Sequence, residues 1–137
     1  MLSPTLATFR LFLHVLAAAI WVGGQFALAG VVPTLRKVAP ATTKPVAQAF
    51  ARLAWPAFIV LVLTGMWNIM AIDITNTSSA YQATVMAHIA IAAGAGVFVA
   101  VHQFGSTTLA KALGGSLGAL LSVGALFLGL LLRTGAA

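Results

Sequence analysis

Two histidines are the residues of this chain best placed for chemistry, because His14 and His88 each lie inside a long apolar segment. Ionisable side chains within membrane-spanning segments are costly and usually functional. If the first and third apolar segments run in the same direction, both imidazoles lie at nearly the same depth, roughly 10 Å from the outer membrane surface at a rise of 1.5 Å per residue. Two imidazoles at one depth predict a shared metal or haem site.

The first histidine belongs to a polar stripe on an otherwise apolar helix. Arg10, Trp21 and Gln25 fall within about 40° of His14 around a helical wheel. Arg10 and Trp21 are therefore predicted to line the same site as His14.

The surroundings of the second histidine favour a flat ligand. The stripe of His88 continues inward through the small side chains Ala92, Ala95 and Val99. Arg10 and Arg133 lie on the predicted outer side, where they could meet two carboxylates. Together these features predict a haem b with axial bonds from His14 and His88 and with propionates directed towards Arg10 and Arg133.

Copper is the competing cofactor. Met66 and Met70 lie one helical turn apart in the second apolar segment. Thioethers suit Cu(I), and imidazoles suit either oxidation state of copper. The copper hypothesis therefore uses His14 and His88 with Met66 or Met70 as further ligands.

The composition indicates an integral membrane protein. The 137 residues are 61% hydrophobic and only 6% charged, whereas soluble domains carry about 25% charged residues. The seven Lys and Arg residues are scattered at segment ends, which excludes a basic face for nucleic acid. The absence of cysteine excludes thiolate chemistry, and the single acidic residue argues against conventional acid–base hydrolysis.

The apolar pattern predicts one domain, residues 1–137, with four transmembrane helices at about 8–32, 50–72, 80–104 and 112–132. Pro33 is expected to end the first helix and Pro56 to lie in the first turn of the second. Pro45 is assigned to the first loop and Lys111 to the third, while Ser78 and Ser79 are candidate N-caps. Short connections predict an all-α, antiparallel up-down four-helix bundle.

The distribution of cations predicts the orientation in the membrane. Two sides of the bundle differ, because the first and third connections with their flanks hold five cations and the opposite side holds two, Arg10 and Arg133. The five are Arg36, Lys37, Lys44, Arg52 and Lys111. We therefore expect both termini on the outer, periplasmic side of a bacterial-type inner membrane.

The segment from His14 to Gly24, with Trp21 seven residues after the histidine, resembles the opening helix of the CopD family of copper-resistance membrane proteins. Thr64-Gly65 is similar to the threonine-glycine pair at the end of that family's next helix. This resemblance implies copper uptake or transfer across the inner membrane.

The layout is also similar to the four-helix HemJ-type protoporphyrinogen oxidases. In that family a histidine of the first helix and a lysine of the third are thought to hold haem, and these positions correspond to His14 and His88. The histidine in place of the lysine implies two imidazole ligands rather than that family's enzyme activity.

Three functions follow as hypotheses. The first is a haem b protein acting in electron transfer or as a subunit of a membrane complex, rather than a stand-alone enzyme. The second is a CopD-type copper protein, and the third is a cofactor-free structural subunit. We expect contact with the lipid bilayer and with other membrane subunits or a second copy, and we interpret His102, near the inner interface, as structural.

Overall fold

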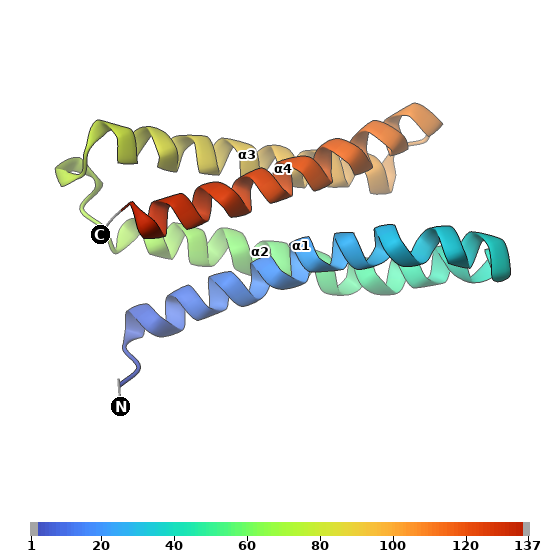
Figure 1. Ribbon diagram of the computed structural model, residues 1–137, viewed down its shortest axis with the longest axis horizontal. Coiled ribbons are helices and arrows are strands. Elements are labelled where there is room, and N and C mark those ends of the chain that lie inside the picture. The colour runs from blue at the N-terminus through green and yellow to red at the C-terminus, as the bar shows by residue number, and fades with distance from the viewer. Residues whose placement is uncertain (1–2, 136–137) are drawn as a thin grey trace. The chain divides into compact units, whose positions relative to one another are not determined.

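The computed structural model describes residues 3–135 and is all-helical. Its four long helices are α1 (Leu6–Val38), α2 (Thr43–Met70), α3 (Ser79–Phe104) and α4 (Thr108–Thr134), with the short 3₁₀ helices η1 (Pro40–Thr42) and η2 (Ile74–Asn76) in two of the connections (Figure 1). All four long helices have the length and composition needed to cross a membrane. The predicted class, an all-α multi-pass membrane protein, is confirmed at this level.

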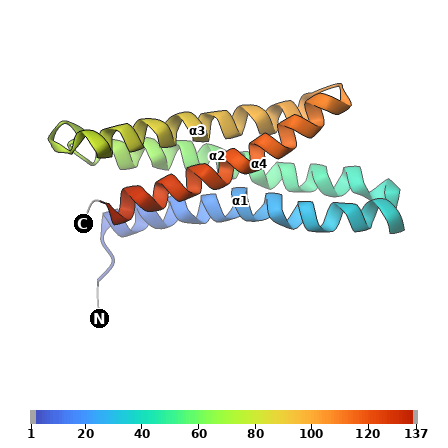
Figure 2. The same ribbon diagram turned by 45° about the horizontal axis from the view of Figure 1, so that its top comes forward.

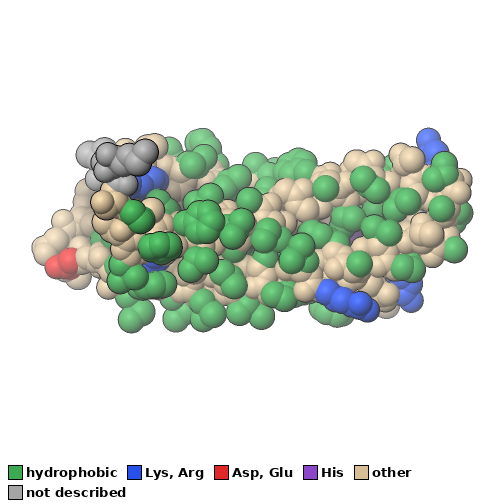
Figure 3. Space-filling view, turned by 90° about the horizontal axis from the view of Figure 1, so that it is seen from below, with side chains coloured by type: hydrophobic (Ala, Val, Ile, Leu, Met, Phe, Trp, Pro, Cys, Tyr) green, Lys and Arg blue, Asp and Glu red, His purple; other side chains and the backbone are tan. Residues whose placement is uncertain are grey.

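The outer surface agrees with this class. Large apolar side chains stand exposed along every long helix, among them Phe12, Ile59, Val97 and Phe127. Figure 3 shows hydrophobic side chains over much of the visible face. Such a surface is stable against lipid and would aggregate in water, so we assign it to the hydrocarbon region of a bilayer.

The helices do not begin or end at the prolines where the sequence pattern predicted their boundaries. α1 continues through Pro33 to Val38, and α2 begins at Thr43, so that Pro45 lies in its first turn and Pro56 in its interior. The predictions that Pro33 ends a helix, that Pro56 opens one and that Pro45 lies in a loop were wrong. A proline removes one backbone hydrogen bond, and long apolar helices tolerate this because neighbouring groups satisfy the released carbonyl.

Hydroxyl side chains cap the starts of α1, α3 and α4. Thr5 forms a capping box with Thr8 at the start of α1, and Ser78 and Thr107 accept backbone N–H bonds at the starts of α3 and α4. Ser78 is thus the predicted cap of the third helix. Lys111 lies inside α4 rather than in the preceding loop, because Thr107 caps that helix four residues earlier.

The only acid of the sequence, Asp73, organises the connection between α2 and α3. Its carboxylate accepts bonds from the Thr75 hydroxyl and the Asn76 amide, both at 2.6 Å. These bonds, that of the Thr75 side chain first, hold the pKa of Asp73 below its ordinary value.

The chain divides into two compact units, Met1–Ile72 and Asp73–Ala137. The first contains α1 and α2, here termed the N-terminal hairpin, and the second contains α3 and α4, the C-terminal hairpin. Within each hairpin the two long helices lie side by side (Figure 2). The two hairpins are described separately below.

Aromatic rings fill the middle of the N-terminal hairpin. Trp21 is only 3% exposed and packs on Phe58 with ring centroids 4.6 Å apart, and on Trp55 at 5.8 Å. One turn further, the ring of Phe50 occupies the space beside Gly24 where a side chain would lie. Glycine at this position therefore allows the ring to bridge the two helices.

Glycines bring the C-terminal hairpin into close contact. A Cβ atom at Gly114 would lie 2.5 Å from the backbone nitrogen of His102, and one at Gly118 would lie 3.1 Å from that of Val99. Gly114 and Gly118 form a G-x-x-x-G pattern, which permits close backbone approach between membrane helices. These two glycines of α4 therefore serve packing against α3.

Candidate functional site

His14 is anchored to α2 through a buried threonine. Its Nδ1 lies 2.8 Å from the hydroxyl oxygen of Thr64, and that hydroxyl donates to the Val60 carbonyl at 2.6 Å. Since the hydroxyl hydrogen is directed to Val60, the imidazole must donate from Nδ1. The lone pair of the neutral ring then lies on Nε2.

His88 has the same tautomer as His14, and here a single contact determines it. Its Nδ1 lies 2.9 Å from the backbone carbonyl oxygen of Ala125 in α4. A carbonyl oxygen can only accept, so Nδ1 carries the proton and Nε2 the lone pair. Both candidate ligands are therefore held in the form that a metal-binding imidazole requires, with the other ring N–H given to a fixed acceptor.

Each imidazole lies beside a glycine of the facing helix. Cβ atoms built at Gly65 and Gly129 would each lie 3.4 Å from the Cε1 atom of His14 and His88, respectively. Gly129 follows Ala125 by four residues. Because helical side chains tilt towards the N-terminus, a side chain at position 129 would lie over the carbonyl that His88 contacts.

His14 and His88 occupy corresponding positions along the helices of their two hairpins. His14 lies eight residues after the first residue of α1, and His88 nine after that of α3. Gly65 and Gly129 each lie five residues before the last residue of their helix. Each hairpin thus holds one imidazole near its open end, half-buried, against a glycine of its second helix.

His102 repeats the arrangement of His88 at the other end of the C-terminal hairpin. Its Nδ1 contacts the carbonyl of Lys111, and Gly115 lies beside its ring. The ring of His102 is exposed and close to the end of α3, whereas that of His88 is half-buried. The bond to a carbonyl therefore also serves helix packing and does not by itself identify a ligand.

Arg10 is held by a residue that the sequence reasoning missed. Its Nε donates to the side-chain oxygen of Asn68 at 2.6 Å. Asn68 lies one turn beyond Thr64 on α2, and Arg10 one turn before His14 on α1, so the two polar pairs form adjacent layers. Arg10 precedes His14 by four residues, and Asn68 follows Thr64 by four residues. Because the two helices are antiparallel, this equal spacing is the sequence signal that could have predicted the pair of Arg10 and Asn68.

The other candidates are dispersed. Trp21 belongs to the aromatic cluster with Phe58, two turns from His14, and Arg133 lies exposed in the last turn of α4. Met66 and Met70 are 55% and 82% exposed. Met66 lies about 200° around α2 from Thr64, the residue that contacts His14.

Within the described residues there is no group of three or more His, Cys, Asp or Glu side chains able to hold a metal ion. Such a group is what a multi-ligand metal centre built from these residue types would require. A haem needs only one or two axial ligands from the protein.

No family model, curated protein or solved structure matches the chain. The resemblance to the CopD and HemJ families therefore stays a prediction.

Proposed function

We propose that the protein is a haem b protein of a bacterial-type inner membrane, with His14 and His88 as axial ligands. The observation that carries this proposal is the matched setting of the two imidazoles. Each donates its Nδ1–H to a fixed acceptor, Thr64 or Ala125, and each lies against a glycine. Metal-ligating histidines almost always donate their other ring N–H to a fixed acceptor of this kind.

The group fits the residues present. When bound, haem supplies one-electron redox chemistry, and the chain supplies ligand orientation and an apolar surrounding. If haem is bound, His14 and His88 would hold it, and the Nδ1 contacts with Thr64 and the Ala125 carbonyl would orient the two imidazoles. The proposed role is electron transfer, alone or as a subunit of a larger complex or of an assembly with a second copy.

The guanidinium groups of Arg10 and Arg133 are proposed to pair with the haem propionates. The bond to Asn68 limits the rotamers of Arg10 and so favours a defined position for its charge. Arg133 lies exposed in the last turn of α4.

The arrangement of the helices is part of the same proposal. An antiparallel up-down bundle with both termini on the periplasmic side would bring α1 and α3 into the membrane in the same direction. The distribution of Lys and Arg favours this orientation.

The test is an absorption spectrum of the detergent-purified protein and of three histidine variants. We expect a reduced-minus-oxidised α-band of b type that is lost in both His14→Ala and His88→Ala. His102→Ala is the matched control, because it removes the same side chain and the same kind of bond but should keep the band.

Three results would contradict the proposal. Equal loss of the band in His102→Ala would mean that the ligand set is misassigned. A colourless protein with stoichiometric copper would favour a copper protein, and a protein with neither would favour a cofactor-free subunit.

A further inference from the structure

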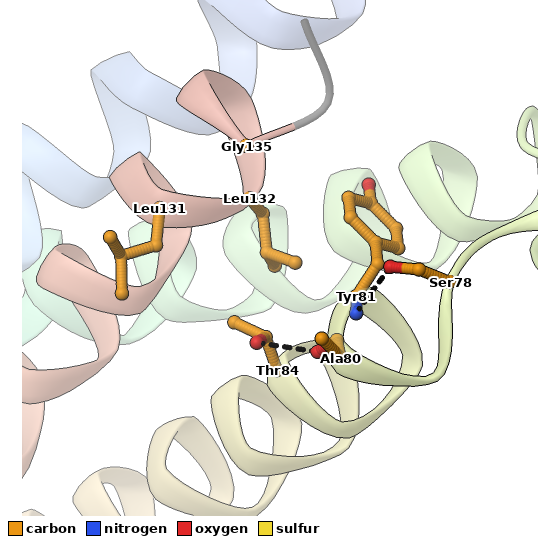
Figure 4. Close-up of a pocket in the computed structure, with 7 residues that line it drawn as sticks. All are labelled: Ser78, Ala80, Tyr81, Thr84, Leu131, Leu132 and Gly135. Carbon is orange, nitrogen blue, oxygen red and sulfur yellow. Dashed lines mark hydrogen bonds between the residues drawn. The ribbon is translucent and has the colours of Figure 1, made fainter.

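A small pocket opens within the C-terminal hairpin, between the first turns of α3 and the last turns of α4 (Figure 4). Its volume is about 160 Å³. A cavity of roughly 150 Å³ accommodates a benzene molecule in an engineered protein core. The pocket therefore has the size of one six-membered ring.

Residues that carry hydroxyl groups line one side of the pocket, and leucines line the other. Ser78, Tyr81 and Thr84 of the α3 side face Leu131 and Leu132 of α4 (Figure 4). An apolar ring would pack on the leucines, and oxygen atoms on that ring would meet the hydroxyls. A ligand with both features matches this lining.

The hydroxyls offer both donors and acceptors. The Ser78 oxygen accepts the backbone N–H of Tyr81, so its own O–H is the group that it can donate. The Thr84 hydroxyl donates to the Ala80 carbonyl at 2.8 Å, so towards a ligand it acts as an acceptor. The Tyr81 phenol can do either. The pocket can thus satisfy carbonyl oxygens as well as hydroxyl groups on a ring.

The lining also selects against charged ligands. Among the described residues that line the pocket there is no Lys, Arg, His, Asp or Glu. The first-turn N–H of Tyr81 is capped by Ser78 and so is not offered to an anion. A neutral ligand therefore fits the site better than a carboxylate or a phosphate.

We propose that this pocket binds the head group of a membrane quinone or quinol. Such a ligand combines a neutral ring, two opposed oxygen atoms and an apolar tail, and it reaches the pocket through the bilayer that the four helices imply. Thr84 precedes His88 by one helical turn. Binding does not require haem, and only the ligand's part as redox partner rests on the proposed function.

Tyr81 allows a direct test because it is the only tyrosine in the sequence. Protein labelled with ¹³C at tyrosine Cζ gives one NMR signal, which reports on hydrogen bonding of the phenol. Titration with decylubiquinone in detergent should shift this signal in a saturable way. Decylbenzene, which has a ring and tail but no oxygen atoms, should leave it nearly unchanged.

A variant pair separates the pocket from its surroundings. Thr84→Val removes an acceptor hydroxyl of the lining. It should weaken the binding of decylubiquinol, whose O–H groups can donate to that hydroxyl, by about three- to tenfold, the effect of one hydrogen bond. Thr134→Val is the matched control, since Thr134 also donates to the carbonyl four residues before it, at 3.0 Å, but does not line the pocket. It should bind as the parent protein does.

Two results would overturn the proposal: the absence of a saturable shift with decylubiquinone, or an equal shift with decylbenzene, which would indicate a merely apolar site. Equal weakening in both threonine variants would also contradict it. Quinone binding by a protein that lacks haem would refute the proposed function and leave this inference standing.

Discussion

Replacement of Gly114 by alanine should destabilise the C-terminal hairpin. The new Cβ would lie 2.5 Å from the backbone nitrogen of His102 and 2.7 Å from the backbone oxygen of Phe98. Ordinary contacts of this kind begin near 3.4 Å, so α3 and α4 must separate by the order of 1 Å. No side-chain rotation can relieve the contact, because both neighbouring atoms belong to the backbone.

The magnitude follows from two opposed effects. Overpacking a well-packed contact costs about 1–3 kcal/mol, and the rigid neighbours of Gly114 place this change in the upper half of that range. The intrinsic helix propensity of alanine over glycine returns up to about 1 kcal/mol. We expect the free energy of unfolding to fall by about 1–2 kcal/mol in Gly114→Ala.

Gly124→Ala is the matched control on the same helix. A Cβ there would meet only the Cγ2 of Ile91 at 3.6 Å, an ordinary contact. This variant should be as stable as the parent or slightly more so. The assay is reversible unfolding by sodium dodecyl sulfate in mixed micelles, followed by circular dichroism. Equal stability of Gly114→Ala and Gly124→Ala would refute the close approach of the two helices.

Two further predictions concern the N-terminal hairpin and the orientation of the chain. Thr64→Val should lower the free energy of unfolding by about 0.6–1.7 kcal/mol, because the Nδ1–H of His14 loses its acceptor. Thr64→Ser should restore most of this loss in the same assay, and an unchanged stability of Thr64→Val would contradict the bond between His14 and Thr64. Because the sequence has no cysteine, the single variants Asp73→Cys and Lys111→Cys can be probed in intact cells with an impermeant thiol reagent. Labelling at 73 but not at 111 is expected for termini outside, and the reverse pattern would mean an inverted orientation.

The membrane class and the number of helices could be predicted from the sequence, because runs of twenty apolar residues leave no alternative to spanning helices. The positions of the helix ends could not. Pro33 and Pro56 indicated boundaries by the rules for water-soluble helices, yet both lie inside helices. In a long apolar segment the remaining backbone bonds outweigh the one that proline removes.

The candidate site could be predicted only in part. His14 and His88 stand out because they are rare ionisable groups in apolar segments. Their acceptors, Thr64 and the carbonyl of Ala125, depend on the register between two helices. No local pattern gives that register, and a backbone carbonyl carries no side-chain signal at all.

The C-terminal hairpin repeats its contacts with a period of seven residues. His88, Ala95 and His102 follow one another at this spacing, and Ala95, between the histidines, is only 1% exposed. The facing helix has the same period in Lys111, Gly118 and Ala125. Seven residues make almost two turns of an α-helix, so this spacing keeps the three residues of each helix on the face that meets its neighbour. Deletion of one residue between His88 and His102 would rotate one of them by about 100° away from that face, and the two histidines could then no longer reach their carbonyls together.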